Sequence, residues 1–287
     1  MGRTARALAP LLALLVLASA CGSGSTGKGG GPAYVALGDS YTAGLGIDPV
    51  ADAKCGRSSV DYPSLVAQDL KITSFDDRSC SGASTLELER PQTAQLVRLN
   101  APQLDSLGRS TTLVTIGIGL NDDQIATGLF DVCLTPPGAA PSNACTQYLT
   151  LPESTIEAKL QAAADRVAQS IEAIAAKAPK ARIVLVGYPR LVPDQGTCPS
   201  RLPVPAAQFE RLRDAIRFTD QAWRDAAEKS GASYVDMYSL SQGHDICSAD
   251  PWVSDYKGVP GKSLSLHPFE SYHRAVADQV VALVKHG

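Results

Sequence analysis

Short, predominantly apolar runs alternate along this chain with longer segments whose apolar residues recur every three or four positions. The runs comprise residues 34–37, 72–75, 111–118, 182–187 and 232–237. Because the runs are rich in β-branched residues and lack a polar face, they predict strands that are buried on both faces, as in a parallel sheet.

The segments between these runs predict helices. Apolar residues occur at helical spacing over residues 61–70, 93–104, 153–178, 206–230 and 270–285. Residues 130–152 instead hold Cys133, Cys145 and four prolines without a clear period, which predicts a surface insertion. Strands that alternate with helices predict an α/β fold, a three-layer α/β/α sandwich around a parallel sheet.

Polar turns follow three of the predicted strands. The first strand ends in Gly38-Asp39-Ser40, a later exit carries Gly82, and a third strand ends in Gly119-Leu120-Asn121-Asp122. Ligands bind at the carboxyl edge of such sheets, so Ser40 is a candidate nucleophile, although an isolated serine there is more often a helix cap or turn residue. No phosphate-binding glycine motif follows any of these strands, so nucleotide binding has no support.

The N-terminal residues predict export. Arg3 and Arg6 precede an apolar run over residues 7–17, which is too short to span a bilayer, and Ala18-Ser19-Ala20 stand before Cys21. The small residues before Cys21 resemble the lipobox of bacterial lipoproteins, with Ala18 where leucine is usual, and predict a lipid anchor on Cys21 that attaches the protein to the membrane.

The chain then divides into a signal peptide (1–20), a flexible Gly/Ser tether (21–32) and one domain (33–287), in keeping with 287 residues of which 44% are hydrophobic and 19% charged. Loss of the two leader arginines changes the formal net charge from -3 to -5. This mild acidity does not indicate nucleic-acid binding, which requires a basic surface.

Six cysteines remain if Cys21 carries lipid, an even number that predicts three disulfides in an exported protein. They are Cys55, Cys80, Cys133, Cys145, Cys198 and Cys247. Fifteen pairings are open from the sequence alone. A metal site is disfavoured, because the chain has no C-x-x-C motif and no closely spaced Cys/His cluster.

Four sequence blocks together identify a family. The α/β-hydrolase elbow is excluded because Thr42 stands where its second glycine belongs. Instead, Gly38-Asp39-Ser40-Tyr41, Gly82, Gly119-Leu120-Asn121-Asp122 and His267-Pro268 resemble, in order, the four blocks of the SGNH or GDSL hydrolase family. The resemblance covers residue 34 to the C-terminus and implies a flavodoxin-like parallel sheet and ester hydrolysis without a cofactor. The similarity to exported actinobacterial esterases and lipases further implies the bridges Cys55–Cys80, Cys133–Cys145 and Cys198–Cys247.

Ester cleavage needs a nucleophile, a base and donors for the oxyanion. Ser40 supplies the nucleophile and His267 the base, because imidazole titrates near neutral pH. The resemblance implies that the oxyanion donors are the backbone N–H groups of Ser40 and Gly82 and the side-chain amide of Asn121. His244 is the main rival as base, whereas His273 and His286 are expected to be structural or solvated.

The residue that orients the histidine departs from the family pattern. Many members carry aspartate three residues before the histidine, and Leu264 occupies that position here. The backbone carbonyl of Leu264 is therefore the expected orienting group, with Asp245, Asp250 and Asp255 as alternatives.

The sequence thus predicts a serine-dependent carboxylic ester hydrolase, an esterase or lipase that acts through an acyl-enzyme at the cell surface on an acyl or acetyl ester. One alternative is a deacetylase of cell-wall or polysaccharide esters, which uses the same chemistry at Ser40. Another is a catalytically silent surface-binding lipoprotein, but a binding module does not need Ser40, Asn121 and His267 together.

Overall fold

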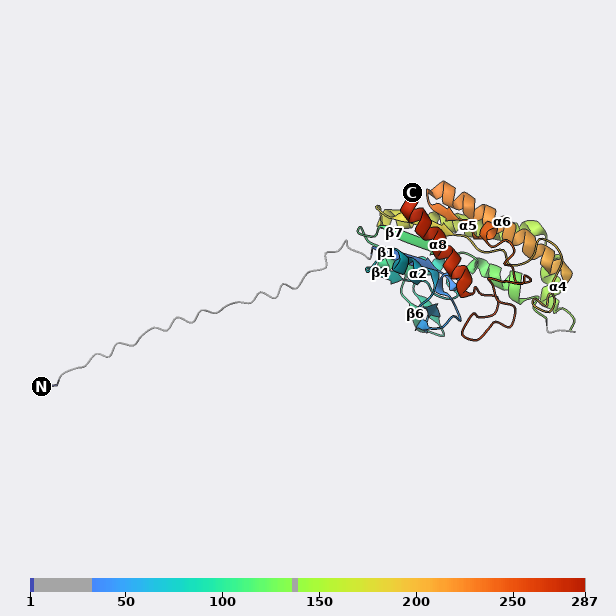
Figure 1. Cartoon of the computed structure of the whole chain (residues 1–287), viewed down its shortest axis with the longest axis horizontal. Coiled ribbons are helices and arrows are strands. Elements are labelled where there is room, and N and C mark those ends of the chain that lie inside the picture. Colours follow the sequence, from blue (N-terminus) through green and yellow to red (C-terminus); the bar gives the residue numbers. More distant parts are fainter. Residues whose placement is uncertain (3–32, 136–138, 287) are drawn as a thin grey trace.

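The computed structural model describes residues 1–2, 33–135 and 139–286 (Figure 1). The lipidation predicted at Cys21, the tether and nearly all of the predicted signal peptide lie outside the described residues. In the part that is described, no helix has both the length and the apolar character needed to cross a membrane.

Five parallel strands form the central sheet of the described chain. In the order β4-β1-β7-β8-β9, they are Phe75–Asp77, Tyr34–Gly38, Leu113–Gly117, Arg182–Val186 and Ser233–Val235. Counted along the chain this is the order 2-1-3-4-5, the flavodoxin-like arrangement that was predicted. In the pairing of β1 with β7, Tyr34 lies opposite Leu113 and Gly38 opposite Gly117. The two strands therefore end level, and their polar turns leave from the same edge.

Alternate residues of the central strands β1, β7 and β8 face two layers of helices, which explains why these strands show no polar face. In β1, Tyr34 and Ala36 pack toward α2 (Tyr62–Asp69) and α8 (Glu270–His286), whereas Val35 and Leu37 pack toward α5 (Glu153–Lys177) and α6 (Ala206–Ser230). Figure 1 shows α5 and α6 lying along each other. The predicted α/β/α sandwich is confirmed.

One predicted helix, over residues 93–104, is wrong. The segment forms an antiparallel hairpin of β5 (Gln92–Ala94) and β6 (Val97–Asn100). Its two turn residues, Gln95 and Leu96, both have positive φ, as a two-residue hairpin turn requires. The apolar spacing misled because Leu96 and Val97 are exposed rather than packed on a core.

The insertion at residues 130–152 contains a helix that the sequence did not predict. A single π-helical turn, η3 (Thr127–Asp131), leads into it, and α4 (Asn143–Thr150) begins where the Ser142 side chain accepts a hydrogen bond from the backbone N–H of Cys145. The remaining short elements are β2 (Val50–Asp52), β3 (Arg57–Ser58), α1 (Ser40–Ala43), α3 (Leu86–Glu89), η1 (Gln103–Ser106), η2 (Asp122–Gln124) and α7 (Met237–Leu240).

The disulfides of the described chain join neighbouring cysteines, as the family resemblance implied. Cys133–Cys145 closes the insertion on itself, Cys55–Cys80 ties the β2/β3 region to the turn after β4, and Cys198–Cys247 joins the loops after β8 and β9. All three bridges lie outside the central sheet, with Cys145 in α4 and the other five cysteines in loops.

Candidate active site

The turn after β1 presents Ser40 at the start of a short helix. Ser40 is the first residue of α1, and the Asp39 side chain caps this helix by accepting a hydrogen bond from the Tyr41 N–H at 2.9 Å. The N–H of a first helical residue has no partner within its helix, so that of Ser40 is available to a ligand. At position 38 only glycine fits, because a Cβ there would lie 2.2 Å from the Thr42 hydroxyl oxygen.

Ser40 and His267 meet across 227 positions of sequence. Their side chains are joined by a hydrogen bond of 2.9 Å between Ser40 Oγ and His267 Nε2. His267 lies in the irregular segment between α7 and α8, so the tertiary fold alone brings the two residues together.

The carbonyl that contacts His267 Nδ1 belongs to Ser265, not to Leu264 as predicted. His267 Nδ1 lies 2.7 Å from the Ser265 oxygen, whereas the Leu264 oxygen accepts hydrogen bonds from the His267 backbone N–H and from Ser254 Oγ. The 264–267 turn has Leu266 as its third residue with a φ of 58°, the sign found in type II turns. This turns the middle peptide, so that the Ser265 carbonyl faces the ring.

The alternative acids all bond elsewhere. Asp245 accepts from the Cys247 N–H and Asp255 from the Lys257 N–H. The Asp250 carboxylate lies 3.4 Å from Nδ1 of His244. Within the described residues, none of the three hydrogen-bonds to His267.

The rival histidines have other partners. His244 stacks on Trp252 with 4.2 Å between ring centroids, and its Nδ1 contacts the Asp250 carbonyl. His273 is fully buried, accepts a hydrogen bond from the Tyr62 N–H, and has its pKa lowered by burial to about 3. His286 is exposed at the end of α8. This leaves His267 as the histidine in contact with Ser40.

Burial lowers the pKa of His267. Removal of the ring from water lowers its pKa, because the imidazolium is the form that loses hydration, and the hydrogen bond to the Ser265 carbonyl opposes this shift. The neutral form that can accept the serine proton is therefore favoured.

Asn121, in the turn after β7, contacts the residue that follows Gly82, another of the predicted oxyanion donors. One N–H of its side-chain amide donates to the Ala83 carbonyl at 2.9 Å, and a primary amide retains a second N–H. Gly82 immediately precedes Ala83 and has a φ of 78°, a conformation that glycine adopts without strain. Gly82 is absent from the described residues that line the cavity around Ser40, but its neighbour Ala83 contacts Asn121, which does line that cavity.

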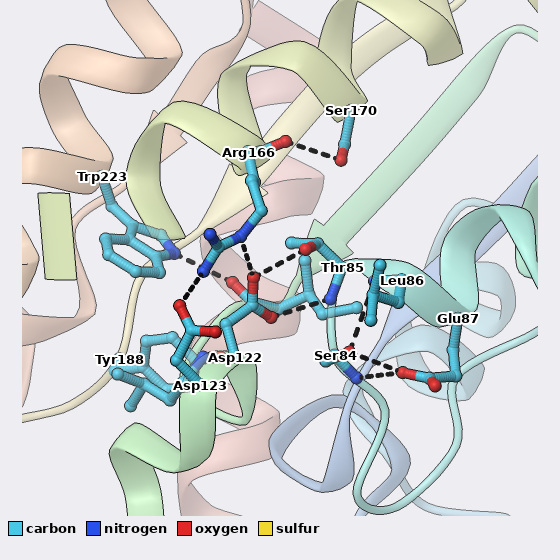
Figure 2. A network of polar contacts seen from close by, with 12 residues as sticks. Ser84, Thr85, Leu86, Glu87, Asp122, Asp123, Arg166, Ser170, Tyr188 and Trp223 are labelled. Atoms are coloured by element: carbon cyan, nitrogen blue, oxygen red, sulfur yellow. Dashed lines mark hydrogen bonds and ion pairs between the residues drawn. The ribbon is translucent and has the colours of Figure 1, made fainter. Parts of the chain in front are cut away.

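A buried carboxylate fixes these two turns to each other and to α5. Asp122 accepts hydrogen bonds from the Thr85 N–H at 2.8 Å, the Thr85 hydroxyl at 2.6 Å and Arg166 Nε at 2.7 Å, while Arg166 also pairs with Asp123 (Figure 2). Each of these contacts is charge-assisted, which makes it stronger than a neutral hydrogen bond. No sequence pattern predicts this network, because Arg166 lies 44 positions from Asp122 on a helical face.

Tyr188, just after β8, joins the nucleophile turn to the turn after β7. Its hydroxyl donates to Asp39 Oδ2 at 2.6 Å and accepts from the Leu120 N–H at 3.3 Å. Burial raises the pKa of Asp39 to about 7, although the bonds from Tyr188 and Tyr41 lower it. Sequence reasoning missed Tyr188, but this residue follows the buried strand β8, and the same strand-end argument that identified Ser40 would have found it.

Ser40, Asn121 and His267 line one cavity of about 320 Å³, with an apolar wall of Leu120, Phe130, Leu264 and Leu266. The cavity lies beside β1 and β7, where the strand order of the sheet reverses, which is the usual ligand site of such folds. Among the described residues, no group of three or more Asp, Glu, His or Cys side chains is placed to share a metal ion.

Comparison with known proteins identifies the family. Residues 36–275 match the GDSL-like Lipase/Acylhydrolase family. The chain is 37% identical over 261 residues to Lipase 2 of Streptomyces coelicolor, which covers 86% of this chain and 84% of that protein. It is 31% identical over 246 residues to the lipase of Streptomyces rimosus, covering 84% and 80% of the two chains.

Solved structures agree with this assignment. The extracellular lipase from Streptomyces rimosus superimposes with a TM-score of 0.69 at 27% identity, over 88% of this chain and 97% of that one. Phospholipase A1 from Streptomyces albidoflavus NA297 gives 0.65 at 26% identity, over 89% and 99%. The chain therefore belongs to the GDSL-like lipase/acylhydrolase family and is a carboxylic ester hydrolase.

Proposed function

We propose that Ser40 and His267 carry out this ester hydrolysis through an acyl-enzyme, without a cofactor. The observation that carries the proposal is the 2.9 Å contact between Ser40 Oγ and His267 Nε2 at the wall of a partly apolar cavity. The geometry meets the requirement that nucleophile and base lie within hydrogen-bond reach.

In the proposed reaction, Ser40 Oγ attacks the ester carbonyl carbon while its proton passes to His267 Nε2. The N–H groups of Ser40, Gly82 and Asn121 donate to the oxyanion that forms. His267 then gives the proton to the leaving alcohol as the carbon–oxygen bond breaks, which leaves an acyl group on Ser40. Water, deprotonated by His267, attacks this acyl group, and the proton returns to Ser40 as the carboxylic acid departs.

The Ser265 carbonyl has a defined part in this cycle. A carbonyl only accepts hydrogen bonds, so it selects the tautomer in which Nδ1 carries the hydrogen and Nε2 is free to take the serine proton. Because the carbonyl is neutral, the imidazolium is stabilised less than it would be by a carboxylate.

We also propose that the domain acts outside the cytoplasm, with residues 1–20 removed as a signal peptide and Cys21 lipidated at the start of the 21–32 tether. Support comes from the three disulfides, which persist in oxidising compartments, and from the small residues before Cys21. Mass spectrometry of the mature N-terminal peptide tests this, since a Cys21 without acyl groups contradicts the anchor.

The test of the catalytic proposal is a panel of aryl esters from acetyl to palmitoyl, assayed with wild type, Ser40→Ala and the control Ser230→Ala at the end of α6. Ser40→Ala should lose thousands-fold or more in kcat, as serine hydrolases do when the nucleophile is removed, while Ser230→Ala keeps wild-type rates. Near-normal turnover by folded Ser40→Ala overturns the proposal. Activity confined to acetyl esters instead indicates the deacetylase alternative.

A further inference from the structure

A second hollow lies next to the catalytic cavity and has no part in the mechanism above. It encloses about 290 Å³ between η3, α4 and the first turns of α5. Its apolar wall consists of Ile125, Leu129, Val132, Tyr148, Leu151 and Ile156. Its size is close to that of the catalytic cavity.

One turn of chain separates the two hollows. Ala126, Phe130 and Asp131 line the catalytic cavity, residues 128, 129 and 132 line the second hollow, and Thr127 lines both. This partition includes the π-helical turn η3, a wide form of helix that occurs often at functional sites. The two hollows are therefore neighbours that share Thr127 as a lining residue.

The second hollow suits an aliphatic ligand better than a polar one. Gly128 permits the Tyr148 ring to form part of the wall, because a Cβ at position 128 would come within 3.1 Å of that ring. Burial raises the pKa of Tyr148 to about 12, so its hydroxyl is uncharged at neutral pH. The one lysine at the hollow, Lys159, directs its Nζ to the Asp123 carbonyl at 3.5 Å.

The chemistry at Ser40 decides which part of an ester lies on this side. His267 must protonate the leaving alcohol, so the alcohol departs along the wall formed by residues 264–267. The acyl group stays on Ser40, beside the expected oxyanion donors, in a cavity that Asn121 and Thr127 also line. The direction from Ser40 toward Thr127 is therefore open to a long acyl chain.

We propose that the second hollow binds the distal methylenes of a long acyl chain that crosses the partition at Thr127, which makes the protein a long-chain acyl-ester hydrolase. The inference rests on the proposed role of Ser40 as nucleophile. Each methylene removed from water should raise kcat/KM by roughly fourfold, so occupancy of the hollow appears as a rise in kcat/KM at long chain lengths.

The experiment fills the hollow from α5. Thr155→Trp places an indole among the lining residues, and Glu157→Trp places the same indole on an exposed position of the same helix outside the hollow. Values of kcat/KM are measured for monomeric p-nitrophenyl esters from acetyl to palmitoyl. Thr155→Trp should match wild type and Glu157→Trp on acetyl and butyryl esters, and lose ten- to hundredfold on dodecanoyl and longer esters.

An unchanged long-chain profile in Thr155→Trp overturns the proposal. So does a loss seen with two-chain glycerolipids but not with single-chain esters, because the hollow would then hold a second chain. Leu151→Trp fills the same hollow from the α4–α5 connection and is measured in parallel with thermal unfolding. A well-folded Leu151→Trp that keeps the wild-type long-chain profile also counts against the proposal. The proposed function is tested separately by acetyl esters. If wild type hydrolyses them and Ser40→Ala does not, the role of Ser40 stands whatever the long-chain esters show.

Discussion

The two sides of the catalytic cavity are held by different kinds of group. On the side of the nucleophile and Asn121, the buried carboxylates of Asp39 and Asp122 receive hydrogen bonds from the turns after β1 and β4, from Tyr188 and from α5. On the histidine side the partners are neutral. The Ser265 carbonyl orients the ring, and Ser263 Oγ and Tyr41 Oη donate to the His267 and Leu266 carbonyls.

This difference fits what each side has to do. Oxyanion donors must already be in place when charge develops, and the charge-assisted hydrogen bonds that Asp122 accepts fix the turns that carry the proposed donors. In the proposed cycle the histidine takes up a proton twice and releases a proton twice. A neutral carbonyl sets its tautomer without holding a permanent charge beside it, and burial keeps its pKa low.

The largest expected effect is on the donor side. Asn121→Ala should lower kcat by about a hundred- to a thousandfold, the usual worth of one oxyanion donor, with a much smaller change in KM. Asn143→Ala, at an exposed position in α4, is the matched control. A change confined to KM would instead mark Asn121 as a contact to the substrate ground state.

The next prediction removes the hydrogen bonds by which Tyr188 connects the turn after β1 to the turn after β7. Tyr188→Phe removes the donor to Asp39 and the acceptor for the Leu120 N–H, but keeps the ring packed against Tyr41 and Trp223. Because hydrogen bonds to charged groups contribute about 1.5–3 kcal/mol, kcat should fall ten- to hundredfold. An unchanged kcat with lower thermal stability would show that Tyr188 stabilises the fold without positioning the donors.

Much of this arrangement could be predicted from the sequence. The sandwich could be predicted from the buried strand runs. Ser40 and His267 could be predicted from residue chemistry and motif order, and their side chains lie 2.9 Å apart in the structure. The helix expected at 93–104 failed because period alone does not show whether apolar residues such as Leu96 pack on a core.

The prediction that the Leu264 carbonyl contacts His267 failed for a different reason. Which carbonyl faces the ring depends on the positive φ of Leu266, and leucine gives no sign of such a conformation. The partners of Asp122 could not be predicted either, since no spacing rule pairs Asp122 with Thr85 and Arg166, which lie on separate elements.

A smaller effect concerns pH. His267 accepts a proton only when neutral, and its pKa is lowered from the ordinary 6.5, so kcat/KM should fall on acidification only below pH 6.5. Asp39, with a pKa of about 7, is the second group that titrates near this range. Asp39→Asn should leave the acid limb in place if His267 causes it. Disappearance of the limb in Asp39→Asn would assign it to Asp39.

The smallest effects are expected at the acids of the histidine side. Asp245 and Asp255 accept backbone N–H groups within their own loop, and Asp250 lies beside His244, so none of them supports the catalytic ring directly. Asp245→Asn, Asp250→Asn and Asp255→Asn should therefore each cost no more than about tenfold in kcat, which corresponds to about 1.4 kcal/mol. In a triad with a carboxylate, the same change costs about ten-thousandfold, because the wrong histidine tautomer is then held. Steady-state kinetics on a short aryl ester, with Asp278→Asn on α8 as the surface control, separates the two cases. A thousandfold loss of kcat in any one folded variant would make that aspartate the orienting acid. The histidine side would then be held by a carboxylate, like the nucleophile side.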